Sequence, residues 1–352
     1  RAARRMSEAT GREASTVHRL LEFNPREGGF QRSFELPLEL DAIVIDEASM
    51  IDLELAAALF AAIPDEARVL LVGDVDQLPS VGPGRVLGDL IESGVVPVAR
   101  LDTIFRQDER GLIVANAHRI LRGEMPRGSD RPDGDFFIIE RDDPEEAART
   151  VAHLVAQRIP TAFGLDALAD VQVLVPMRRG TCGAEALNEA LRRGIHEARR
   201  SEGEPEGAGE GSGGRVQPGD RVMQTRNNYD KDVFNGDVGL ALPSPGRGAV
   251  RVRFEDGREL VYEGEDRDQL DAAFAITIHK SQGSEYPAVV VPLLGQHHRM
   301  LQRNLLYTAV TRGRRLVVLV GSRRAIEQAV RNDQADVRNT GLAWRLRVIA
   351  RR

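Results

Sequence analysis

Cysteine and lysine are almost absent from this chain. Cys182 is the single cysteine among 352 residues, which excludes an internal disulfide and a cysteine-built zinc site. A lone thiol is typical of a buried side chain in a reducing compartment, so we expect a cytoplasmic protein. Only two of the 48 basic residues are lysine, Lys231 and Lys280. Arginine suits bidentate contacts with phosphate, but a GC-rich genome explains the same bias and is the preferred interpretation.

Long apolar runs are also missing. No stretch approaches the roughly 18 apolar residues of a membrane span, and no signal peptide opens the chain. The hydrophobic content of 41%, the charged content of 29% and the net charge of −6 indicate a soluble globular protein without a broadly basic surface. The seven histidines form no metal-like pair, and we expect no zinc. The chain can hold two or three domains, and because it begins mid-pattern at Arg1, we expect it to be part of a longer protein.

Apolar segments that end in acidic residues alternate with helical patterns. DAIVIDE at 41–47 and ARVLLVGD at 67–74 are typical of buried strands, and ELAAALFAAI at 54–63 is typical of a helix. Strands that alternate with helices predict a parallel sheet covered on both faces. A second set of apolar segments predicts a second, interrupted α/β domain; the set comprises VAHLVAQRI from 151 and the runs at 171–176, 273–278, 288–294 and 316–321.

Two stretches fall outside this alternation. SEGEPEGAGEGSGG at 201–214 has six glycines, four glutamates and no large apolar residue, so we expect a mobile loop. Short alternating runs follow it to residue 271 and predict a small β-barrel. EFNPREGGFQRSFELP at 22–37 predicts a β-hairpin, which needs a partner surface because an isolated hairpin is only marginally stable.

Asp46 and Glu47 follow directly on the first predicted strand. A carboxylate at the carboxyl end of a parallel strand lies where ligands bind in open α/β sheets. One acid suffices to hold Mg²⁺ when phosphates and water supply the other ligands, and the second acid can orient or deprotonate water. The pair also suits the start of a helix, since acids favour its positive end. GDVDQLPSVGPG at 73–84 favours the functional interpretation, because this irregular loop presents Gln77, which can sense a terminal phosphate.

Several segments, in this order along the chain, resemble helicase motifs. They are RAARRMSEATGREASTVHRLL for the tail of motif Ia, IVIDEASM for motif II, GDVDQLPSVGPG for motif III, LDTIFRQ at 101–107 for motif IV, FAITIHKSQGSEYP at 274–287 for motif V, and LLYTAVTRGRRLVVLVG at 305–321 for motif VI. The chain therefore resembles superfamily 1 helicases of the 5′-to-3′ class (superfamily 1B), and most closely the RecD-like DNA helicases.

The resemblance implies an α/β fold of two RecA-like parallel-sheet domains with an inserted SH3-like β-barrel. A first RecA-like domain that lacks its phosphate loop would comprise residues 1–105, including the hairpin at 22–37. The second would comprise 106–190 and 272–352, and the SH3-like insert 191–271, with its mobile loop at 201–214. The hairpin resembles the pin that parts the duplex in such helicases; the alternative is a surface ribbon packed on the barrel.

The resemblance also implies an ATP site between the two α/β domains. Asp46 would hold Mg²⁺, Glu47 would activate water, and Arg312 would reach the γ-phosphate as an arginine finger, a duty shared with Arg106. The implied catalytic residues are Asp46, Glu47, Gln77, Arg106 and Arg312, and the implied ATP-binding residues are Gly73, Asp74, Gly283 and Glu285.

DNA contacts follow from the same motifs, although a strand end or a helix face packed on the core would explain some of these residues equally well. The implied DNA-binding residues are Thr16, His18, Arg19, Thr277, His279, Lys280, Ser281 and Asn227, with Arg226 and Asn228 beside Asn227.

The expected function is that of a monomeric, ATP-dependent 5′-to-3′ helicase or translocase in DNA repair or recombination. Its substrates would be single-stranded DNA and duplexes with a 5′ single-stranded tail, with no membrane involved.

The phosphate-binding motif GxxxxGK[ST] is absent, because neither lysine lies in a glycine loop. We expect the motif to lie before Arg1 in a longer protein, and we expect the chain alone to hydrolyse ATP poorly. The competing class is a catalytically inactive DNA-binding or complex-forming subunit on the same scaffold. An AAA-type or other P-loop switch is disfavoured by GDVDQLP together with TIHKSQGSE.

Overall fold

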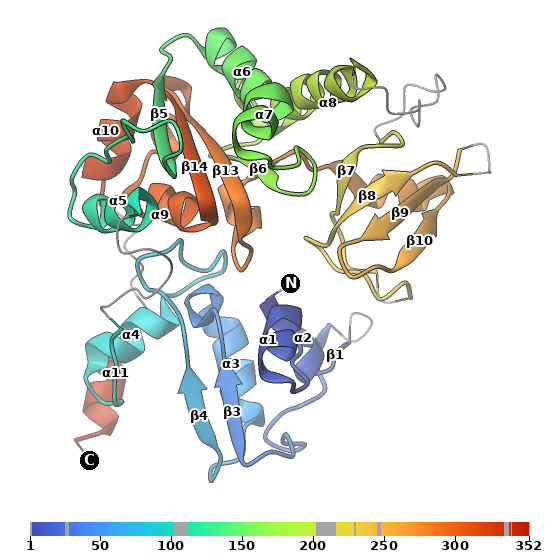
Figure 1. Cartoon of the computed structure of the whole chain (residues 1–352). Helices are drawn as coiled ribbons and strands as arrows, with labels where there is room; N and C mark the ends of the chain where they lie inside the picture. The colour runs from blue at the N-terminus through green and yellow to red at the C-terminus, as the bar shows by residue number, and fades with distance from the viewer. Residues whose placement is uncertain are drawn as a thin grey trace. The chain divides into compact units, whose positions relative to one another are not determined.

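The computed structural model describes residues 2–24, 28–101, 111–201, 216–228, 230–244, 248–333, 338 and 340–351 (Figure 1). The chain forms two compact units: the first comprises residues 1–106 and 334–352, and the second residues 107–333. The chain therefore passes from the first unit into the second and then returns. In the described part of the chain, no helix combines the length and apolar character that crossing a membrane requires.

A two-stranded parallel sheet carries the predicted acidic residues of the first unit. β3 (Ala42–Ile45) pairs with β4 (Arg68–Leu71), and α3 (Leu53–Ala62) connects them. Helix α3 begins after Asp52 because the carboxylate of Asp52 accepts a hydrogen bond from the Leu55 N–H at 2.8 Å. The other elements are α1 (Ala2–Thr10), α2 (Val17–Leu20), β1 (Phe23–Asn24), β2 (Gly29–Phe30), η1 (Ala48–Met50), α4 (Val86–Ser93) and α11 (Leu342–Ile349).

This sheet buries one face and exposes the other. Ile45 is buried in a cluster with Ala56 and Leu59 of α3, whereas Val44 and Leu70 are 55% and 56% exposed. The predicted strands at 41–47 and 67–74 are thus present. Among the described residues, however, the helices cover only one of the two faces that the sequence pattern predicts to be covered.

The second unit contains a five-stranded parallel sheet in the order β12 (Ala275–Thr277), β6 (Val171–Val175), β13 (Tyr286–Leu293), β14 (Gly313–Gly321), β5 (Phe136–Glu140). Alternate side chains of its central strands face opposite layers of helices. One layer holds α6 (Pro144–His153), the π-helical η2 (Leu154–Arg158), α7 (Ile159–Phe163) and α8 (Ala184–Ser201). The other holds α5 (Leu112–Leu121), α9 (Arg303–Thr311) and α10 (Arg323–Arg331) (Figure 1).

Strand β5 is not among the predicted segments, and the helical state of residues 151–159 is not predicted either. VAHLVAQRI begins the second set of apolar segments, but it forms the end of α6, η2 and the start of α7. Its buried residues Val151, Leu154, Val155 and Ile159 recur at helical spacing and pack in the main core of the unit.

The insert forms a five-stranded antiparallel sheet in the order β10-β9-β8-β7-β11. The strands are β7 (Arg221–Gln224), β8 (Val238–Leu242), β9 (Val250–Phe254), β10 (Glu259–Tyr262) and β11 (Leu270–Ala272). Its core includes Val222, Val252, Phe254 and Tyr262, so the predicted short strands are present. Of the predicted loop 201–214, only Ser201 lies inside the described residues. Single 3-10 turns are η3 (Gly264–Gln269), η4 (Ile278–Ser281) and η5 (Gly295–Met300).

The C-terminal residues differ from the predicted domain boundary. The sequence places 334–352 in the second RecA-like domain, whereas these residues group with the first unit. Helix α11 packs against α4, and Arg347 donates a hydrogen bond to the carbonyl of Glu92 at 3.0 Å. These contacts hold the C-terminal helix on the first unit.

Candidate active site and nucleic-acid interface

Glu47 sits at the carboxyl end of β3 in a strained backbone conformation. Its φ of +53° and ψ of 37° lie in the left-handed region, which costs a residue with a side chain roughly 1–2 kcal/mol. Strain of this kind persists where the surroundings fix the backbone. Here the Ala48 N–H donates to the Val72 carbonyl at 2.9 Å, and the Glu47 N–H donates to Asp46 Oδ1 at 2.9 Å.

The loop at 73–84 is attached closely to this turn. A Cβ atom on Gly73 would lie 3.0 Å from the Ser49 nitrogen and 3.1 Å from the Ala48 nitrogen, so only glycine fits without a shift. Because Ile45 and Leu71 are register partners in the parallel sheet, residues 46–47 and 73–77 emerge at one edge. The two predicted motifs are therefore brought together.

The acidic loop residues are linked by hydrogen bonds. Gln77 Nε2 donates to Asp74 Oδ2 at 3.1 Å, and the Asp76 N–H donates to Asp74 Oδ1 at 3.0 Å. Burial raises the pKa of Asp76, and the charge of Asp74 adds to the shift while Arg100 opposes it. Asp74 thus holds the Gln77 amide in place beside the strand ends.

A metal ion at this edge would need ligands besides the protein's own side chains. Asp46 is exposed, and the described residues contain no group of three or more His, Cys, Asp or Glu side chains able to hold a metal ion. An ion bound at Asp46 would take most of its ligands from phosphate and water, which suits Mg²⁺ because it usually retains several waters.

Arg312, at the end of α9, joins two predicted motifs inside the second unit. Its guanidinium is buried, and it donates to the carbonyls of Ser284 at 3.1 Å and Thr308 at 3.2 Å. Glu285 accepts two hydrogen bonds from Arg314, at 2.7 and 2.8 Å. Gly283 forms the intervening turn with a φ of +69°. Arg106 lies outside the described residues.

The segment 277–281 presents some of its predicted residues and buries others. Thr277 ends β12, and Lys280 is exposed. Both line a cavity of about 510 Å³ with Arg178, Asn188 and Asp271, among others. Burial lowers the pKa of His279. Ser281 is fully buried, and its hydroxyl donates to the Ile278 carbonyl at 2.7 Å.

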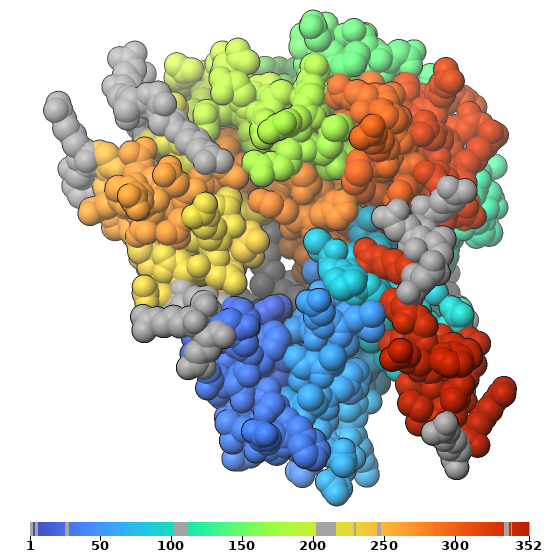
Figure 2. All heavy atoms as spheres, turned by 180° about the vertical axis from the view of Figure 1, so that it is seen from behind, coloured from blue at the N-terminus to red at the C-terminus, as the bar shows by residue number. Residues whose placement is uncertain are grey.

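The SH3-like insert forms one wall of this cavity through Met223 and Asp271. Arg192 of α8 donates to the buried carboxylate of Asp220 at 2.9 Å, which ties the insert to the helix. Figure 2 shows the insert surface, coloured yellow to orange, next to that of α8. The predicted DNA contacts Asn227 and Asn228 form hydrogen bonds within the insert. Asn227 Oδ1 accepts from the Asn235 N–H at 3.0 Å, and Asn228 Nδ2 donates to Gln269 Oε1 at 3.1 Å.

In the first unit, the predicted DNA contacts of α2 are exposed and lie next to the hairpin. The Thr16 hydroxyl caps α2 by accepting from the Arg19 N–H at 3.4 Å. The centroid of the His18 ring lies 5.9 Å from that of Phe23 and 5.6 Å from that of Phe30, and the centroids of the two phenyl rings are 5.2 Å apart. Phe23 and Phe30 are cross-strand partners, so a short hairpin of residues 23–24 and 29–30 lies within the predicted segment 22–37. Residues 25–27 lie outside the described residues.

Arg338 is a residue that the sequence analysis did not single out. Its guanidinium donates to backbone carbonyls of the 73–84 loop. No motif covers it, and nothing in the surrounding RNDQADVRNTG distinguishes it from the other arginines.

Three family models match the chain. They describe an AAA domain over residues 1–83, an ATP-dependent RecD-like DNA helicase SH3 domain over 187–254, and a UvrD-like helicase C-terminal domain over 272–320.

Among curated proteins, the ATP-dependent RecD2 DNA helicase of Deinococcus radiodurans is 39% identical over 99% of this chain and 45% of its own length. The RecBCD enzyme subunit RecD of Mycolicibacterium smegmatis is 34% identical over 96% of this chain and 60% of its own length. The chain thus spans about half the length of these relatives. A Bacteroides Pif1 helicase structure in complex with ADP-AlF3 and ssDNA matches with a TM-score of 0.50 and 18% identity, covering 92% of this chain and 81% of that one, which supports the fold alone.

Proposed function

The chain belongs to the RecD-like helicases, and from this premise we propose that it is part of an ATP-driven motor that moves 5′ to 3′ on single-stranded DNA. The observation that carries the proposal is the convergence of Asp46, Glu47 and Gln77 at one edge of a parallel sheet, with Glu47 held in a strained turn. The proposed substrates are single-stranded DNA and duplexes with a 5′ single-stranded tail. The motor acts as a monomer in DNA repair or recombination.

The proposed roles follow from the chemistry of each group. Asp46 would hold Mg²⁺, which neutralises phosphate charge when bound. Glu47 orients and deprotonates the attacking water, and Gln77 senses the γ-phosphate. Arg106 and Arg312 supply positive charge to the transition state; arginine fingers contribute roughly 10³–10⁵ in rate.

Coupling between ATP and DNA is proposed to run through Arg312. Because its guanidinium already donates to the Ser284 carbonyl, a phosphate that engages Arg312 acts on the segment containing Thr277 and Lys280. These two residues, with Thr16, His18 and Arg19, are proposed to hold the DNA backbone without reading its sequence. Ser281 is buried, and we propose only a local structural role for it.

The phosphate-binding loop is proposed to come from outside this chain. The chain has no GxxxxGK[ST] motif, and the apolar side chains of Val44 and Leu70 are exposed on the sheet that carries Asp46. Further elements, including that loop, would complete this sheet in the whole protein.

Replacing Glu47 with glutamine tests the proposal. In the complete protein, Glu47→Gln is expected to lower DNA-stimulated ATP hydrolysis by roughly 10²- to 10⁴-fold, the range for general acid–base groups, and to preserve nucleotide binding. The matched control is Glu54→Gln, an exposed acid in the first turn of α3. Wild-type turnover in Glu47→Gln would remove Glu47 from catalysis. No turnover in the wild-type protein with DNA bound would favour the non-catalytic subunit.

A further inference from the structure

The loop at 73–84 is held at its far end by a residue from the C-terminal segment, defined here as Arg338 with residues 340–349. Arg338 Nη1 donates to the carbonyls of Gly82 and Gly84, both at 2.7 Å, and Nη2 donates to the carbonyl of Ser80 at 2.7 Å. Nη1 also contacts Ser80 Oγ at 2.9 Å. One guanidinium therefore satisfies three carbonyls of a single turn.

The Ser80 hydroxyl also lies among these carbonyls, 3.2 Å from the Gly82 oxygen and 3.3 Å from the Gly84 oxygen. It has one proton to donate, so the guanidinium supplies the remaining donors. Hydrogen bonds from a charged donor are shorter and stronger than neutral ones, and a buried carbonyl left without a donor destabilises the fold. Ser80 is buried, so water cannot readily replace the guanidinium there. The conformation of residues 80–84 therefore depends on Arg338.

The opposite side of the same turn lies against the start of α3. A Cβ atom on Gly82 would collide with the Asp52 carboxylate, and one on Gly84 would lie 2.5 Å from Leu53 Cγ. The Leu53 N–H donates to the Pro83 carbonyl at 2.8 Å. The turn is thus enclosed between α3 and Arg338.

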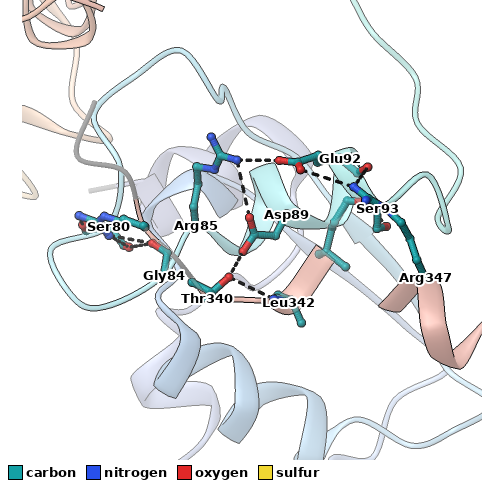
Figure 3. A network of polar contacts seen from close by, with 11 residues as sticks. Ser80, Gly84, Arg85, Asp89, Glu92, Ser93, Thr340, Leu342 and Arg347 are labelled. Atoms are coloured by element: carbon teal, nitrogen blue, oxygen red, sulfur yellow. Dashed lines mark hydrogen bonds and ion pairs between the residues drawn. The ribbon is translucent and has the colours of Figure 1, made fainter. Parts of the chain in front are cut away.

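The C-terminal segment is itself anchored on α4. Figure 3 shows Thr340 pointing toward Asp89 and Arg347 toward Glu92. The Thr340 hydroxyl donates to the buried Asp89 carboxylate and accepts from the Leu342 N–H at 3.2 Å. Arg347 contacts Glu92 but makes none of the loop contacts that Arg338 makes.

We propose that Arg338 is a positioning residue for ATP hydrolysis. It holds the 73–84 loop in the conformation that presents Asp74 and Gln77 beside Glu47, and it does so from the part of the chain that has just left the second unit. This inference rests on the proposed function for its catalytic consequence. Its structural part, the immobilisation of the loop, is independent of that function.

The test compares Arg338→Ala with the matched control Arg347→Ala in the complete protein. A displacement of about 1 Å in a catalytic group can cost roughly 100-fold in rate. We therefore expect Arg338→Ala to lower kcat of DNA-stimulated ATP hydrolysis by roughly 10- to 100-fold, with KM for ATP unchanged. Millimolar methylguanidinium should restore part of kcat, an effect that a general loss of stability would not produce. Arg347→Ala should retain wild-type kcat, because the contact of Thr340 with Asp89 still anchors the segment.

Hydrogen exchange of the Leu53 amide reports on the loop directly, because its acceptor is the Pro83 carbonyl. Exchange should be faster in Arg338→Ala than in the wild type, and unchanged in Arg347→Ala. If Arg338→Ala does not fold, Arg338→Lys takes its place and should give an intermediate kcat. Wild-type kcat in the Arg338 variant, or a reduced kcat with unchanged Leu53 exchange, would overturn the proposal. If the wild-type protein lacks ATPase activity, the proposed function fails, while Leu53 exchange still decides whether Arg338 holds the loop.

Discussion

His279 and Lys280 are neighbours in the segment proposed to bind DNA, yet they differ in charge. Burial lowers the pKa of His279 and so favours its neutral imidazole. Because the folded-state pKa is depressed, the folded protein loses stability as the pH falls from the ordinary pKa of histidine toward the lowered one. Lys280 is exposed and positively charged. The sequence motif marks both residues equally, because the burial of His279 depends on how η4 packs.

This difference in charge predicts that Lys280 and His279 contribute differently to the salt dependence of DNA affinity. Each phosphate contact by a cation contributes roughly −0.7 to the slope of log K against log salt on single-stranded DNA. Lys280→Gln should therefore reduce the magnitude of the slope by about that amount, while His279→Gln should leave it unchanged at pH 7.5. Fluorescence anisotropy with a labelled single-stranded oligonucleotide between about 50 and 200 mM salt measures both. A reduced slope in His279→Gln would show that the histidine carries charge when DNA binds.

At the scale of elements, the sequence predicts those whose pattern is local. The strands that deliver Asp46 and Gly73 are present because each is a short apolar run bounded by turn residues. β5 is not among the predicted segments, although FFIIE at 136–140 is also a short apolar run between turn residues. Its place in the sheet depends on a remote partner, with Phe136 opposite Val317. The position of α11 escapes prediction for the same reason, since its contact with Glu92 joins residues 255 positions apart.

The hairpin makes a further prediction at this scale. Deleting residues 25–33 would remove Phe30 and with it part of the cluster that contains His18. A sharper change replaces residues 25–28 with Asn-Gly, a turn that favours a tight hairpin and retains Phe23 and Phe30. If the hairpin is the proposed wedge, DNA-stimulated ATPase activity should remain while unwinding of a duplex with a 5′ tail is lost. Retained unwinding would reject the wedge and favour a ribbon that only supports α2.

The chain passes between its two units twice. The second connection, between Asn332 and Arg338, is short. Asn332 ends α10 and is fixed to the second unit, since its Nδ2 donates to the Leu301 carbonyl at 2.9 Å. Arg338 is fixed to the first unit. Six residues of extended chain span at most about 20–22 Å. If the proposed motor opens between its two units, this connection would limit the opening.

The family resemblance implies that ATP binds between the two units; if it does, lengthening this connection should affect ATP capture and leave the chemical step unchanged. Inserting eight Gly/Ser residues between Gln334 and Ala335 lengthens the connection from six residues to 14. Effective concentration falls roughly as the −3/2 power of linker length, so recapture of one unit by the other should weaken about three- to fourfold. We expect KM for ATP to rise by a similar factor with kcat unchanged, whereas Arg338→Ala should lower kcat with KM unchanged. Steady-state ATPase assays with saturating single-stranded DNA distinguish the two patterns. An unchanged KM after insertion would mean that this connection does not limit ATP capture.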